Sequence, residues 1–269
     1  MGVMKRWIPF LKADPAVSIV RVVGVIATGG RGSTINDENL SPYLEKAFTK
    51  NSPKAVGLLI NCPGGSPVQS SLIGTKIKYL SNKHQVPVYA FVEDVAASGG
   101  YWIACCADEI YVDESSILGS IGVISASFGF NQIMKKQGIE RRVYTSGTDK
   151  SMLDPFRPEK PSDVKRLKRL QKQIHQTFIN HVKNCRGVKL SNHKDLFTGE
   201  IWIGKKAIEV GLVDGIAHFK PFFEKKFGEK VKINIFGGKK SILQRFGAKL
   251  LANNIEELNY QALWNRFGL

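Results

Sequence analysis

Three short glycine-rich segments each follow an apolar run, and one of them holds a serine suited to nucleophilic chemistry. The segments span residues 61–66, 96–101 and 119–122. Ser98 lies among small residues at an expected strand-to-helix turn, where its hydroxyl is exposed and a helix N-terminus stabilises developing negative charge. Gly99 leaves a backbone N–H free for an oxyanion hole, and a second glycine loop can supply another. The alternative for Ser98 is a helix cap packed among glycines.

A nucleophilic serine needs a base, and the sequence offers histidine or lysine. None of the five histidines follows an expected strand beside an acidic residue, so nothing favours a Ser–His–Asp triad, which remains an alternative. Lys150 directly follows an apolar run, in the glycine-containing loop 146–151. A lysine must be neutral to accept a proton. Lys150 is therefore the candidate base, and the alternative is a solvated loop lysine.

The elements that must position these residues alternate between apolar and amphipathic stretches. Apolar runs rich in β-branched residues predict strands at 17–26, 55–60, 86–92, 110–112, 119–125 and 140–144. Helical spacing of apolar residues predicts helices at 36–50, 66–80, 98–107, 128–137 and 162–184. This alternation is typical of an α/β fold with mainly parallel strands, in which ligands gather at the carboxyl ends of the strands.

The chain is strongly basic, and the charge is uneven. Its 269 residues contain 39 Lys and Arg against 23 Asp and Glu, which gives a net charge of +16. The segment 135–189 holds 15 of these cations and 5 of the acidic residues. Such a balance suggests nucleic acid or an anionic membrane as a partner, and a solvated helix face is the alternative.

The composition is that of a globular protein, with 43% hydrophobic and 23% charged residues. No run of about 18 apolar residues predicts a membrane-spanning helix, and the apolar patch at 7–11 is too short for a signal peptide. The four cysteines form no C-x-x-C pair, so we expect no structural zinc, and the thiols are expected to be reduced. No metal and no cofactor are expected.

The motifs together resemble those of the signal peptide peptidase A (SppA/SohB-like) family of Ser–Lys serine peptidases. The matching segments are 61–65, 97–101, 119–123 and 146–150, and the resemblance runs from about residue 17 to residue 214. It implies a ClpP/crotonase-like fold of repeated ββα units. We expect residues 17–218 to form one catalytic domain, between an N-terminal extension of 1–16 and a basic amphipathic tail of 219–269.

By position in these motifs, the resemblance implies a role for each candidate residue. Ser98 is the nucleophile and Lys150 the general base, while Gly65 and Gly99 supply backbone N–H groups to the oxyanion. Ser120 hydrogen-bonds the lysine amine. Single-copy family members complete the dyad between neighbouring protomers of a ring, so a homo-oligomer is expected. Two further matches are Asp94, a loop-ordering acid, and Tyr101, a packing residue.

Two departures from the family pattern affect the expected setting. Cys62 stands where the family commonly has serine, and we interpret it as a small packed residue. The sequence shows no N-terminal membrane segment, so a cytoplasmic location with peripheral contact at the anionic inner face of the membrane is expected. The expected activity is that of a serine endopeptidase that cleaves short, extended, apolar peptides such as released signal peptides.

Two other classes of function stay open. A crotonase-type enzyme acting on acyl-CoA would share the oxyanion hole but leave Ser98 and Lys150 without roles. A non-enzymatic module would bind nucleic acid or anionic lipid through its basic surface. The basic helix at 162–184 lacks interleaved surface aromatic residues, so nucleic acid is not an expected partner.

Overall fold

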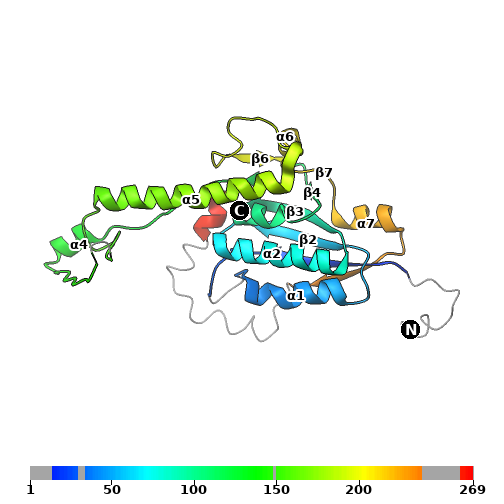
Figure 1. Ribbon diagram of the computed structural model, residues 1–269, viewed down its shortest axis with the longest axis horizontal. Coiled ribbons are helices and arrows are strands. Elements are labelled where there is room, and N and C mark those ends of the chain that lie inside the picture. Colours follow the sequence, from blue (N-terminus) through cyan, green and yellow to red (C-terminus); the bar gives the residue numbers. More distant parts are fainter. Residues whose placement is uncertain (1–13, 30–33, 148–149, 238–260, 269) are drawn as a thin grey trace. The chain divides into compact units, whose positions relative to one another are not determined.

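The structure, a computed structural model, describes residues 14–29, 34–147, 150–237 and 261–268 (Figure 1). The chain forms two compact units. The first comprises Met1–Ile121 and His181–Leu269, and the second comprises Gly122–Asn180.

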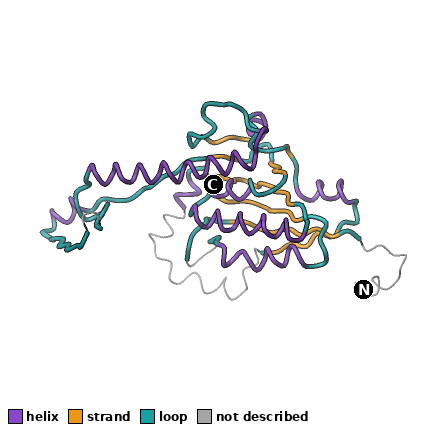
Figure 2. The backbone as a smooth tube through the Cα atoms, viewed as in Figure 1, coloured by secondary structure: helices purple, strands orange, loops and turns teal. Residues whose placement is uncertain are grey.

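The first unit is built on one mixed sheet, whose strands are orange in Figure 2. Among the described residues the sheet has eight strands, and its main order is β6-β5-β3-β2-β1-β8, with β4 beside β3 and β7 beside β4. The bounds are β1 Ala16–Val23, β2 Val56–Cys62, β3 Val88–Ala97, β4 Glu109–Val112, β5 Ile117–Gly119, β6 Ile201–Ile203, β7 Gly215–Ile216 and β8 Lys232–Phe236. All pairs are parallel except β5 with β6. The predicted parallel α/β architecture is confirmed.

Helices α1 (Asp37–Thr49) and α2 (Pro67–His84) lie side by side along the sheet (Figure 1). Both begin where the sequence supplies a cap. The Asn36 side chain accepts a hydrogen bond from the Asn39 N–H at 2.9 Å, and Ser66 precedes a proline at the first position of α2. This unit also contains α3 (Gly99–Ala104), α6 (Gly204–Glu209), α7 (Phe219–Phe227), the end of α5 (Pro161–Arg186), the short 3-10 helix η2 (Gly187–Lys189) and a helical segment at 261–265.

Residues 219–236 of the expected tail include α7 and β8, and β8 is a strand of the sheet. β8 pairs in parallel with β1, from Ala16 opposite Lys232 to Val20 opposite Phe236. Phe223 of α7 is fully buried in a core cluster with Ile19 and Phe91. Burial of these aromatic side chains joins α7 to strands that lie far away in the sequence. Residues 238–260 of the expected amphipathic tail lie outside the described residues.

The second unit contains α4 (Asn131–Lys136) and most of the long helix α5, which confirms the helices predicted at 128–137 and 162–184. The strand predicted at 140–144 is wrong, and so is the one at 119–125 beyond Gly119, the last residue of β5, because residues 120–130 and 139–146 have no regular structure. A strand needs a hydrogen-bonding neighbour. Here Arg141 pairs with Asp154 and Arg142 with Glu140, so the 140–144 segment is an exposed, ion-paired loop.

Candidate active site

Ser98 lies at the sharp turn between β3 and α3. Its backbone has φ 51° and ψ −118°, which non-glycine residues rarely adopt and which costs of the order of 1–3 kcal/mol. Its N–H donates to the Gly119 carbonyl at 2.8 Å, and its carbonyl accepts from the Trp102 N–H at 3.0 Å. The residue is partly exposed, and its side chain makes no capping hydrogen bond. Ser98 therefore occupies the cap position of α3 without serving as a cap.

The first glycine loop lies directly against this turn. Gly64 has φ +107°, and a Cβ there would be 2.8 Å from the Ser98 Cβ and 3.0 Å from the Gly99 nitrogen. Only glycine fits at this approach. Sequence reasoning chose Gly65 in this loop and missed Gly64, although the double glycine was the available signal.

The backbone N–H groups of Gly65 and Gly99 are both suited to bind an oxyanion. Gly65 lies opposite Ile26 in a parallel bridge. The Ile26 N–H donates to the Gly64 carbonyl and the Ser66 N–H donates to the Ile26 carbonyl, each at 2.8 Å, so the Gly65 N–H takes no part in the bridge. Gly99 opens α3, so its N–H has no acceptor within that helix. If Gly99 carried a Cβ, that atom would lie 3.4 Å from the Gly65 nitrogen. The two candidate donors are thus neighbours beside Ser98.

Ser120 follows the neighbouring strand at the same level as Ser98. Ala97 pairs with Gly119 across β3 and β5, so the two serines come directly after paired residues. Ser120 is 7% exposed, has φ 50° and donates its N–H to the Glu200 carbonyl at 2.8 Å. The structure therefore brings Ser120 beside the turn that carries Ser98. The Glu200 contact had no signal in the sequence, because Glu200 is far along the chain.

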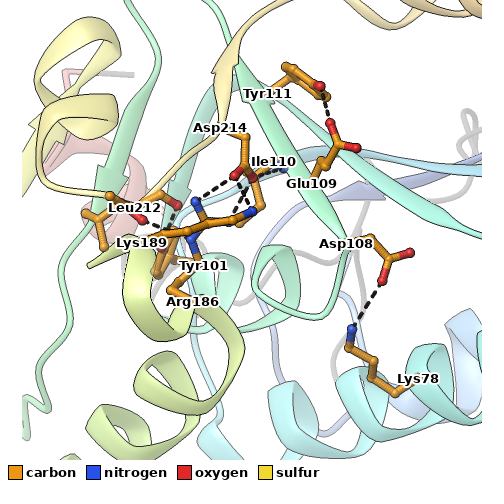
Figure 3. Close-up of polar contacts among 11 residues, drawn as sticks. Lys78, Tyr101, Asp108, Glu109, Ile110, Tyr111, Arg186, Lys189, Leu212 and Asp214 are labelled. Carbon is orange, nitrogen blue, oxygen red and sulfur yellow. Dashed lines mark hydrogen bonds and ion pairs between the residues drawn. The ribbon is translucent and has the colours of Figure 1, made fainter. Parts of the chain in front are cut away.

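Tyr101, a residue of α3, holds this helix in place after Ser98. This side chain is fully buried and donates its hydroxyl to the Leu212 carbonyl at 2.7 Å (Figure 3). Burial raises the pKa of the Tyr101 phenol well above its usual value, which keeps the hydroxyl protonated as a donor. The expected packing role of Tyr101 thus includes a hydrogen bond.

Beside this anchor, Arg186 makes a two-pronged ion pair with Asp214 (Figure 3), with N–O distances of 2.8 and 3.1 Å. Asp214 also accepts from Lys189 at 2.6 Å and from the Ile110 N–H at 2.8 Å. Burial disfavours the charged carboxylate, but the hydrogen bonds from Arg186, Lys189 and Ile110 outweigh it, so the pKa of Asp214 is lowered. This cluster connects the end of α5 to β4 and to the segment before β7.

Two other residues of the family pattern have structural settings. The Asn61 amide, near the end of β2, donates to Asp94 of β3, and the expected loop-ordering role of Asp94 remains a prediction. Cys62 is fully buried, and burial raises the pKa of its thiol to about 12. Cys62 is therefore the small packed residue that we expected and not a reactive thiolate.

Lys150 lies in the second unit, whereas Gly65, Ser98, Gly99 and Ser120 lie together in the first. It is exposed, and its backbone N–H contacts the Gly147 carbonyl at 3.4 Å. Its pairing with Ser98 remains a prediction. Among the described residues, no group of three His, Cys, Asp or Glu side chains could hold a metal ion.

Comparison with known proteins identifies the family. The model of Peptidase family S49 matches residues 81–230, more than half of the chain. A putative signal peptide peptidase SppA of Enterococcus faecium is 31% identical over 73% of this chain and 58% of the relative. A Brucella abortus (strain 2308) protein named Na(+)/H(+) antiporter NhaA is 44% identical over the whole of this chain. The chain spans only 39% of that protein's length.

Two solved structures share the fold. Both are mutants of the 1510-N membrane-bound stomatin-specific protease, one of them in complex with a substrate peptide. Their TM-scores are 0.51 and 0.52 at 14% identity, and the matches cover 85% and 88% of this chain and 100% and 98% of the solved chains. The chain thus has a ClpP/crotonase-like α/β fold and belongs to peptidase family S49, among its SppA/SohB-like members.

Proposed function

We propose that this chain is a serine endopeptidase in which Ser98 is the nucleophile and Lys150 the general base. The observation that carries the proposal is the setting of Ser98. The residue is partly exposed on a strained turn, beside the backbone N–H groups of Gly65 and Gly99. A nucleophile beside two backbone donors is the arrangement that acyl transfer requires.

In the proposed reaction, the Ser98 Oγ attacks the carbonyl carbon of the scissile peptide bond while the neutral amine of Lys150 takes its proton. The resulting oxyanion accepts hydrogen bonds from Gly65 and Gly99. The C–N bond then breaks, and the leaving amine takes the proton from Lys150. A water molecule hydrolyses the Ser98 ester, with Lys150 again accepting and returning a proton. Ser120 orients the lysine amine.

The proposed substrates are short, extended, apolar peptides such as released signal peptides. The support is the name of the Enterococcus relative, a putative signal peptide peptidase, and the peptide bound to one fold relative. We also propose a homo-oligomeric ring. In the single-copy family members that this chain resembles, neighbouring protomers complete the dyad, and the same arrangement here would make assembly a condition of activity.

The proposed location is cytoplasmic, with peripheral contact at an anionic membrane. Along the described residues, no helix combines the length and the apolar character needed to cross a bilayer. The support for membrane contact is the net charge of +16, which favours anionic lipid.

The test is covalent labelling with a fluorophosphonate, read by intact mass and peptide mapping, together with native mass of the assembly. We expect one label on Ser98 and none on Ser98→Ala. Lys150→Ala should lower kcat/KM for a peptide substrate by about 10²–10⁴-fold, whereas Lys160→Ala, an exposed lysine of the same unit, should not. Wild-type activity should rise toward alkaline pH, since a lysine base must be neutral.

Each alternative predicts a different result. Substantial activity in Lys150→Ala would show that the dyad is assigned wrongly. Turnover of an acyl-CoA thioester without any label on Ser98 would support the crotonase-type function instead.

A further inference from the structure

We infer that Trp202 is a positioning residue for Ser98 and Ser120, acting through the peptide link between Gly119 and Ser120. The inference rests on the proposed function, because it assigns Trp202 a part in presenting the nucleophile. Trp202 lies on β6 and is 5% exposed, and it pairs with Leu118 of β5. It does not belong to any of the glycine-rich motifs.

The indole ring fills the space beside Gly119. A Cβ on Gly119 would be 2.7 Å from the Trp202 Cδ1 and 2.9 Å from the Glu200 carbonyl oxygen. Gly119 itself has φ +91°. The indole ring therefore leaves no room for a side chain at position 119, so only glycine fits there. The positive φ of this glycine sets the direction in which the chain enters Ser120.

Two backbone hydrogen bonds transmit this contact to both serines. Ser120 donates its N–H to the Glu200 carbonyl, and Ser98 donates its N–H to the Gly119 carbonyl, each at 2.8 Å. Ser98 and Ser120 both have φ near +50°. Such strained residues persist only where the surrounding structure holds them. For Gly119 and Ser120, the strand segment from Glu200 to Trp202 is that surrounding structure.

The shape of the ring, rather than its polar atom, is what the site uses. The Trp202 Nε1 is buried and has no hydrogen-bond partner among the described residues. The ring also makes an edge contact with His193, at 4.9 Å between ring centroids and an interplanar angle of 87°. Trp202→Phe should therefore keep most of the ring surface that packs against Gly119, whereas Trp202→Ala should remove it.

The experiment compares Trp202→Ala and Trp202→Phe with Ile203→Ala. Ile203 is the matched control, since it lies on the same strand, pairs with Ile117 and is half exposed. Three measurements are made on the full chain: hydrogen exchange of the Ser98 and Ser120 amides, kcat and KM separately, and the rate of fluorophosphonate labelling. A double-mutant cycle with Ser120→Ala tests whether Trp202 acts through Ser120.

We expect Trp202→Ala to lower kcat and the labelling rate by about a hundredfold with little change in KM, and to speed exchange at both amides. Trp202→Phe should stay near wild type, and in the Ser120→Ala background the Trp202→Ala change should cost less than it does alone. Equal losses in Trp202→Ala and Ile203→Ala, or unchanged amide exchange, would overturn the inference. If wild type takes no label at Ser98, the proposed function fails, and the exchange data alone decide the role of Trp202.

Discussion

The backbone N–H of Ser98 donates to the carbonyl of Gly119 at 2.8 Å, so the candidate nucleophile is held by the residue that precedes Ser120. This bond continues the register in which Ala97 pairs with Gly119. Because both serines leave their strands at positive φ, a change in one turn is expected to disturb the other.

Gly64→Ala should inactivate the protein while leaving it largely folded. The new methyl group would meet the Ser98 Cβ at 2.8 Å and the Ala97 carbonyl oxygen at 2.9 Å, and so would push the nucleophile out of position. We expect the loss of fluorophosphonate labelling at Ser98. Gly228→Ala is the control, since Gly228 also has positive φ but open space around it. Normal labelling of Gly64→Ala would contradict the close approach.

Phe223→Ala should destabilise the fold by about 3–5 kcal/mol, because it removes a fully buried aromatic ring from the cluster on the sheet. The free energy of unfolding in urea gives the measurement. Lys220→Ala, on the same helix and exposed, should change it little. A small effect of Phe223→Ala would show that α7 contributes little to the stability of the sheet.

Arg186→Met should cost about 3–5 kcal/mol in unfolding free energy, because it removes the buried member of the pair and leaves the partly buried Asp214 carboxylate with only Lys189 as a charged partner. Adding Asp214→Asn to Arg186→Met should recover part of the loss, since the remaining charge of the cluster, on Lys189, is exposed to water. A double variant less stable than Arg186→Met would argue that the carboxylate has other essential contacts.

The Asp214 carboxylate should make the free energy of unfolding of the wild type fall at acid pH. Its folded pKa is lowered, so its contribution is present above the unfolded value of about 3.9 and is lost as pH falls through the folded value. Urea unfolding between about pH 5 and pH 2 should show a steeper loss in wild type than in Asp214→Asn. Parallel curves would show that Asp214 does not contribute in this range.

His181 should weaken the fold as pH falls below about 6.5. Burial lowers the pKa of this imidazole, helped by the nearby charge of Lys78 and opposed by the hydrogen bond to the Trp102 carbonyl. The unfolded state therefore binds its proton first, so the stability is full above about pH 6.5 and declines below it.

His181→Phe keeps an aromatic ring where His181 stacks on Trp102, at 4.3 Å and 7°, but it removes the titrating group. We expect a lower unfolding free energy at pH 8, because the hydrogen bond is lost, and a smaller decline from pH 8 to about pH 5.5. An undiminished decline would assign the acid sensitivity to other groups.

The sequence by itself determined the features that depend on neighbouring residues. Ser98 and Gly99 predict a turn between a strand and a helix because small residues permit it, and buried apolar runs such as that of β2 predict parallel strands. The long helix α5 followed from its apolar stripe.

Only the tertiary structure decided what depends on residues far apart in the chain. It pairs Ala16 with Lys232 and so makes β8 part of the sheet, and it leaves the 140–144 segment without a strand partner. It also places Trp202 against Gly119. Local sequence patterns carry backbone and burial preferences, but strand pairing and side-chain contact also depend on which distant segment lies opposite, and that is settled only when the chain folds.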